Sequence, residues 1–193
     1  IWVLVALYFQ SGLGHSALAA GSVGIPAALL SSISATLAGR SVSVHGRKVV
    51  VLGMLVTISG LIATIALIWA TEQWGASEWW MVLSLALVGG GQGSVISPNQ
   101  TLTLAHVPQA YAGSSGAVLQ TGQRIGTAIG LAIITAIVFA TLHGTSADWP
   151  LSIIAGFGVI LAMCLASLGF AVADQHRSQA VSYTHLRAHE TGR

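Results

Sequence analysis

The feature that most constrains this chain is a long apolar stretch, Gly113 to Ala140, which reads GSSGAVLQTGQRIGTAIGLAIITAIVFA. About 20 such residues span the roughly 30 Å hydrocarbon core of a bilayer as an α-helix. The stretch contains a single charged residue, Arg124, close to Gln120, Gln123 and Thr127. Because polar groups are disfavoured in lipid, we predict a membrane helix whose polar face lines a water-filled path.

The same stretch carries a ladder of glycines. Gly122, Gly126 and Gly130 recur at every fourth position. At about 100° of rotation per residue, the ladder lies on a face nearly opposite Arg124. Small residues let two membrane helices approach closely, so we predict that the ladder packs against a neighbouring helix.

The depth of Arg124 in the membrane leaves two interpretations open. If the helix enters the membrane near Ser114, Arg124 lies about 15 Å along it at 1.5 Å per residue. An ionisable residue at that depth is a candidate for direct work on a substrate or a proton. If the crossing is instead Ile125–Leu142, the side chain reaches the cytoplasmic interface and its role is structural or gating.

The composition places the whole chain in a membrane. Only 6% of the residues are charged and 54% are hydrophobic, whereas a soluble domain averages about 25% charged residues. Lipid offers no partner for unpaired backbone groups, so we predict an all-α integral membrane protein with about five full transmembrane helices. A shorter apolar stretch, Ile1–Phe9, is expected to be the remainder of a truncated first helix. The full helices are expected at Ala17–Ala38, Val49–Ala70, Trp79–Pro98, Ser114–Leu142 and Pro150–Ala173.

The charges of the connecting loops predict the orientation. Gly39–Lys48 holds Arg40, Arg47 and Lys48 and no acid, whereas Thr71–Glu78 holds acids and no base. Lysine and arginine gather on the cytoplasmic side of membrane proteins. We therefore expect the loops Gly39–Lys48 and Asn99–Ala112 and the C-terminus in the cytoplasm, in a multi-pass protein of the cytoplasmic membrane. An interfacial belt of tryptophans is expected at the opposite boundary: Trp69, Trp74, Trp79, Trp80 and Trp149.

The fourth apolar segment combines glycines with polar residues. Gly89 and Gly93 are four residues apart and small enough for close helix packing. Gln92 and Asn99 are seven residues apart and share a face, and Pro98 interrupts the backbone hydrogen bonds. One interpretation is a cavity-lining helix with a flexible cytoplasmic end. The other is a packing helix with polar residues at its interfacial end.

The sequence contains no pattern that indicates an enzyme active site. The predicted helices hold no Asp or Glu, and the sequence has no nucleophile, phosphate-binding or zinc-protease motif. We therefore predict no catalytic residue, cofactor or metal ion. No basic patch faces water, so nucleic acid is not an expected partner.

The polar C-terminal residues 175–193 are expected to form a cytoplasmic tail. Residues 182–193, SYTHLRAHETGR, have no helical stripe and resemble read-through of linker or adaptor sequence. A native disordered tail is the alternative. His185 and His189 have the spacing of a metal-binding pair, but a metal site needs more ligands, so none is predicted.

The loop sequence GRSVSVHGRK is similar to the cytoplasmic loop signature of the major facilitator superfamily, a glycine, an acid and then Gly-Arg-Lys. Gly39, Gly46, Arg47 and Lys48 match the signature, while Ser43 stands at the acidic position. With the stretches YFQSGLGHSALAAG, SPNQTLTLAHVP and GAVLQTGQRIGTAIGLA, the chain resembles the C-terminal half of the fourteen-helix drug:proton antiporter family.

The resemblance implies a helical half-bundle over residues 1–174. Its partners would be the lipid bilayer, a missing N-terminal half, protons, and a small hydrophobic or cationic substrate. The implied function is proton-coupled multidrug efflux by alternating access, in which two halves rock about a site near the bilayer midplane. The alternative is a non-transporting membrane scaffold or assembly partner built from the same helices.

Overall fold

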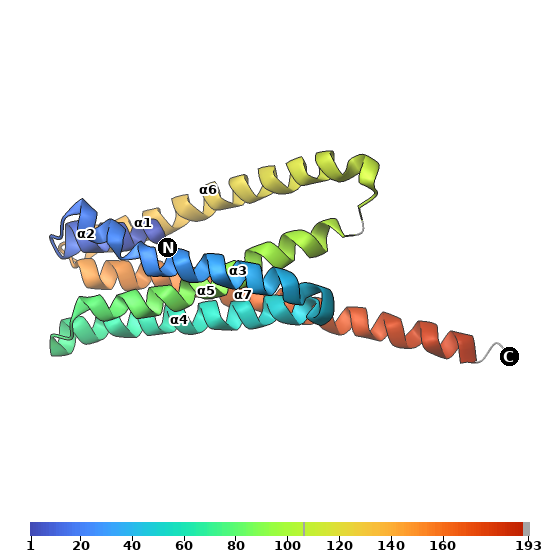
Figure 1. The fold of residues 1–193 in the computed structure, drawn as a ribbon. Coiled ribbons are helices and arrows are strands. Elements are labelled where there is room, and N and C mark those ends of the chain that lie inside the picture. The colour runs from blue at the N-terminus through green and yellow to red at the C-terminus, as the bar shows by residue number, and fades with distance from the viewer. Residues whose placement is uncertain (106, 191–193) are drawn as a thin grey trace.

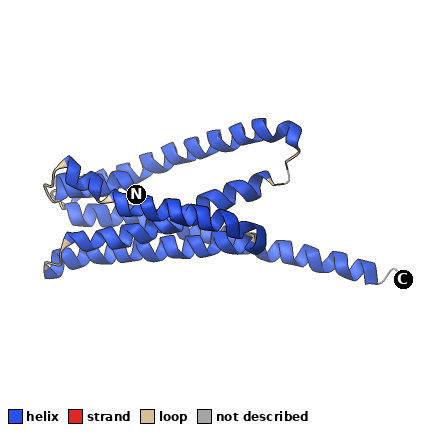
Figure 2. Cartoon of the chain, in the orientation of Figure 1, coloured by secondary structure: helices blue, strands red, loops and turns tan. Residues whose placement is uncertain are grey.

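A computed structural model describes the backbone of residues 1–105 and 107–190 and the side chains of residues 1–42, 44–105 and 107–173. All the secondary structure of the described residues is helical (Figure 2). Long helices run up and down the length of one bundle (Figure 1). In chain order the elements are α1 Trp2–Leu7, the π-helical η1 Tyr8–Gly12, α2 Ala17–Ser22, α3 Gly24–His45, α4 Arg47–Trp74, η2 Glu78–Trp80, α5 Met81–Leu104, η3 Gln109–Tyr111, α6 Ala112–Gly144 and α7 Trp149–Glu190.

The predicted fold class is confirmed. Within the described residues, five helical stretches are long and apolar enough to cross a membrane, and the first apolar helix, Trp2–Gly12, is shorter. The span at residues 17–42 consists of α2 and α3, which are separated at Val23. Pro26 lies just after this break, where its ring and missing N–H disfavour a continuous helix.

The predicted end of the fourth segment is wrong. We expected the helix to stop at Pro98, but α5 continues to Leu104, so Asn99 is helical rather than part of a loop. Hydroxyl groups support this last part of the helix, since Thr101 donates to the Ser97 carbonyl at 3.1 Å and Thr103 donates to the Asn99 carbonyl at 2.7 Å. Neither bond reaches the Ser94 carbonyl, whose helical donor is the N–H that Pro98 lacks.

The predicted loop at residues 39–48 is also wrong. α3 runs to His45 and α4 begins at Arg47, so Gly46 alone connects them. Gly46 has φ 53° and ψ −132°, a conformation that glycine adopts without a steric penalty. The basic residues of the motif therefore belong to helix ends: Arg40 lies in α3, and Arg47 and Lys48 form the first turn of α4.

The backbone of the expected tail is helical as far as Glu190, because α7 continues without a break past the predicted boundary at residue 174. The described membrane-spanning part of this helix is Trp149–Ala173. The side chains of residues 174–190, including His185 and His189, and residues 191–193 as a whole lie outside the described part of the chain.

Glycines on α5 set the packing of the central helices. An added Cβ at Gly89 would collide with the backbone of Ala27 in α3, and one at Gly93 would collide with the backbone of Ser31. On another side of α5, Gly91 lies against Thr57 of α4. α5 is thus held closely between α3 and α4.

A buried hydroxyl pair joins two of these helices. The hydroxyls of Thr64 in α4 and Ser84 in α5 lie 2.8 Å apart. The Thr64 hydroxyl also lies 2.8 Å from the Gly60 carbonyl, and the Ser84 hydroxyl lies 3.0 Å from the Met81 carbonyl. Because each hydroxyl has one hydrogen, one of the two donates across the pair and the other donates to the carbonyl of its own helix. The polar groups of the pair are therefore satisfied inside an apolar bundle.

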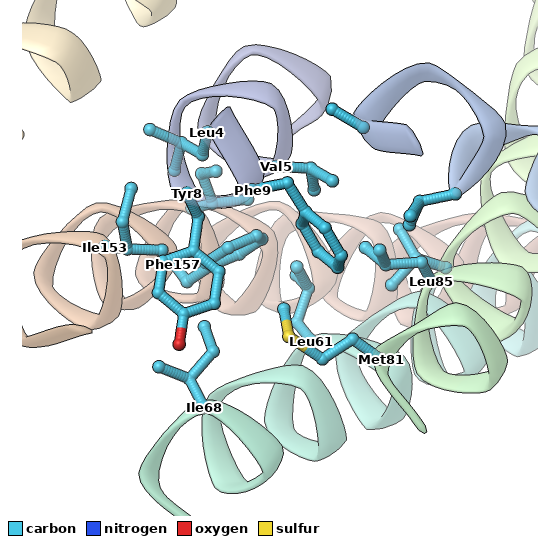
Figure 3. Close-up of a cluster of buried hydrophobic side chains, with 14 of the residues drawn as sticks. Leu4, Val5, Tyr8, Phe9, Leu61, Ile68, Met81, Leu85, Ile153 and Phe157 are labelled. Atoms are coloured by element: carbon cyan, nitrogen blue, oxygen red, sulfur yellow. The ribbon is translucent and has the colours of Figure 1, made fainter. Parts of the chain in front are cut away.

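The short first helix is anchored in an apolar cluster that Figure 3 shows. Tyr8 and Phe9 of η1 are almost fully buried, as is Phe157 of α7. The cluster also includes residues of α4 and α5, so it binds the first helix to three others. Its further labelled members are Leu4, Val5, Leu61, Ile68, Met81, Leu85 and Ile153.

Candidate functional site

Helix α6 stands apart from the rest of the bundle. Only 6% of its most apolar window is buried, against 39% for α4 and 44% for α5. Val138 is its single buried residue, and Ile134 packs against the same core cluster. Both lie in the C-terminal half of the helix, and the N-terminal half diverges from its neighbours (Figure 1).

The polar residues predicted on α6 lie together along this diverging part. Gln120, Gln123, Arg124 and Thr127 line one open hollow of about 530 Å³ that the helix forms by itself with Ala128 and Leu131. The Thr127 hydroxyl donates to the Gln123 carbonyl at 2.8 Å. No described carboxylate pairs with Arg124, so this surface has exposed donors and no protein partner within the described side chains.

The length of α6 limits the depth of Arg124. The helix ends at Gly144, about 30 Å further along its axis at 1.5 Å per residue. That distance equals the thickness of the hydrocarbon core. For a helix that leaves the membrane near Gly144, Arg124 therefore lies close to the opposite edge of the core.

The glycine ladder faces no described helix. An added Cβ at Gly122, Gly126 or Gly130 would meet no atom within 4 Å. Within this chain the close packing is instead made by Gly89 and Gly93 of α5. The predicted packing role of the α6 ladder therefore stays a prediction, because it requires a partner helix outside the described residues.

Gln92 and Asn99 belong to a second group, away from the α6 hollow. Gln92 lines a hollow of about 380 Å³ between α4, α5, α6 and α7, and Asn99 lines one of about 350 Å³ near the start of α4. The two hollows share Met54 and Ser167, so they follow one side of α5. The structure thus separates the predicted path residues into two sets.

The loop-motif residues surround the α3–α4 connection. An added Cβ at Gly39 would lie 3.3 Å from the Ser97 hydroxyl of α5. Arg47 lines the same hollow as Asn99, and Lys48 lines another of about 420 Å³ between α3, α4 and α5. The motif therefore lies at the same end of the bundle as the last turns of α5.

One polar contact was not predicted from the sequence. The Nε2 atom of His15 lies 3.1 Å from Oε1 of Glu78, in a contact that joins the α1–α2 connection to the α4–α5 turn. The positions are 63 residues apart, so no local pattern signals the pair. Among the described residues, no group of three or more His, Cys, Asp or Glu side chains could hold a metal ion.

Among the described residues, five apolar spans form a helical bundle with an exposed polar helix face, which is the architecture of a polytopic membrane protein. A comparison with protein-family models matches residues 1–185 to the Major Facilitator Superfamily. The chain belongs to this superfamily, whose members are membrane transporters rather than enzymes. Comparisons with curated proteins and with solved structures gave no significant match.

Proposed function

We propose that this chain is one half of a secondary active transporter that exports small hydrophobic or cationic compounds in exchange for protons. The observation that carries the proposal is the polar face of α6. Arg124 and its neighbours lie exposed on a helix that is long and apolar enough to span the membrane. An arginine at the bilayer centre costs about 3 kcal/mol on insertion scales; the cost is smaller near the edge of the core, but the guanidinium there still seeks water or a polar partner.

The other faces of α6 support a second half of the bundle as that partner. The glycine ladder has no described neighbour, and most of the apolar window of the helix is unburied. In this superfamily the two halves meet around a central site. Because the ladder and Arg124 lie on nearly opposite faces, a missing N-terminal half would surround α6, with one element packed against the ladder and another across the water-filled path from Arg124.

The proposed role of Arg124 is gating. A guanidinium group is always charged and offers five donors in a fixed planar fork. It would hold a carboxylate or helix-end carbonyls of the other half in one state and release them in the next.

We place the α3–α4 connection and the C-terminus in the cytoplasm of the cell that carries the transporter, on the basis of the positive charges at residues 39–48.

The test measures efflux of a fluorescent cationic compound from energised cells that express the complete transporter. Arg124→Ala should lose most of the efflux, and Arg124→Lys should retain part of it because the charge remains without the fork. Thr121→Ala is the matched control, since the Thr121 hydroxyl is exposed and bonds only to the Ala117 carbonyl of its own helix.

The amount of transporter in the membrane is measured for each variant. If Arg124→Ala transports as well as the parent, Arg124 is only an interfacial anchor and the gating role is wrong. If the complete protein transports no cationic compound under any gradient, the scaffold alternative replaces the transporter proposal.

A further inference from the structure

The His15–Glu78 contact lies in an unusual local structure. The first helix ends in a π-helical turn, Tyr8–Gly12, and such turns are frequent at functional sites. The chain then turns back through Gly14, with φ 74°. The His15 backbone N–H donates to the Phe9 carbonyl at 2.8 Å, so the ring is presented toward the α4–α5 turn.

Aromatic rings hold the imidazole in place. The His15 ring centroid lies 5.7 Å from that of Phe9 and 5.5 Å from that of Trp79. Phe9 is fully buried, so one side of the imidazole is fixed to the core. The side chains of His15 and Glu78 are 29% and 26% exposed, and water therefore reaches both groups.

The ionisable groups in the connections at this end of the bundle are acids, a phenol and a second histidine, His143 in the last turn of α6. Glu78 bonds to the imidazole, Glu72 lies at the end of α4, and the Tyr8 hydroxyl is close enough to both to feel their charge. Asp148 stands at the start of α7, where its carboxylate accepts from the Leu151 N–H at 3.0 Å. Residues 13–16, 71–78 and 143–149 include no Lys or Arg.

We propose that His15 and Glu78 form a proton-binding latch that fastens the α1–α2 connection to the α4–α5 turn when the imidazole is protonated. A protonated imidazole gives a charge-assisted hydrogen bond, which is about twice as strong as a neutral one. Histidine is the side chain whose charge ordinarily changes between about pH 5 and 8.

The test is hydrogen exchange on the purified chain in lipid nanodiscs at about pH 5.5 and about pH 8. The reporters are the amides of Leu13 and His15, which donate to the carbonyls of Tyr8 and Phe9. Protection factors are corrected for the intrinsic exchange rate at each pH. From the difference in hydrogen-bond strength, we expect protection about three- to tenfold higher at the lower pH.

Two variants and one control decide the outcome. His15→Gln keeps a donor toward Glu78 but has no imidazole to protonate, and it should abolish the pH dependence. Glu78→Gln keeps the shape but removes the carboxylate charge, and it should weaken the pH dependence. His143→Gln, in the last turn of α6, should preserve it. Equal protection of the parent at both pH values, or a pH dependence that survives in both variants, would overturn the latch. Neither result bears on transport through the α6 face.

Discussion

Replacement of Gly89 by alanine tests the packing of the central helices. The new Cβ would lie 2.8 Å from the carbonyl carbon and 2.9 Å from the Cα of Ala27, whereas carbon atoms pack at about 3.5–4.0 Å. Both contacts are backbone atoms, so α3 and α5 must separate by roughly 1 Å, and a gap of that size forfeits about a quarter to a half of each affected contact. Overpacking of this kind costs about 1–3 kcal/mol, and we expect about 2–3 kcal/mol for Gly89→Ala.

The matched control is Gly122→Ala on α6. A Cβ there meets no atom within 4 Å, and alanine is a better helix former than glycine by up to about 1 kcal/mol. The free energies of unfolding of both variants are measured by denaturant titration of the chain in mixed micelles. Equal losses at Gly89 and Gly122, or a Gly89→Ala variant as stable as the parent, would refute the packing we describe.

Three further predictions follow from the same contacts. Gly126→Leu should leave the thermal stability of this chain unchanged and destabilise the complete transporter; an unaffected complete transporter would show that the ladder is not a packing face. Ser77→Cys, in a Cys164→Ala background, should react with a membrane-impermeant thiol reagent from outside the cell, and reaction only after membrane disruption would reverse the orientation. Ser84→Ala should cost about 0.6 kcal/mol, the average for hydroxyl bonds between membrane helices, because Thr64 keeps its bond to the Gly60 carbonyl; a loss above about 2 kcal/mol would contradict this.

The sequence predicts the membrane helices well because their lengths follow from the thickness of lipid. The positions of the helix ends depend on local backbone conformation and hydrogen bonding, which hydropathy does not describe. α5 continues past Pro98 to Leu104, and the expected loop before α4 shrinks to Gly46 because glycine can adopt a positive φ.

The packing surfaces and polar pairs are less accessible to sequence reasoning. The glycines at 89 and 93 and those at 122 and 126 have the same spacing, yet only the first pair meets another helix in the described structure. Which ladder has a partner depends on tertiary contacts. The His15–Glu78 pair likewise arises from two turns that only the folded bundle brings together. The clustering of Gln120, Arg124 and Thr127 needs only helical periodicity.

The central claim is that one face of α6 lines a water-filled path in the complete transporter. Thr127 lies on the proposed polar face, and Ile129 is 56% exposed on the other side of the same helix. Each is replaced by cysteine in a Cys164→Ala background, and reaction with a small, charged, membrane-impermeant thiol reagent is measured in intact cells and inverted vesicles. We predict that Thr127→Cys reacts from one of the two sides and that Ile129→Cys, which lies on the ladder side of α6 and away from the proposed path, reacts from neither. Equal reactivity at both positions, or no reaction at Thr127→Cys, would contradict the account.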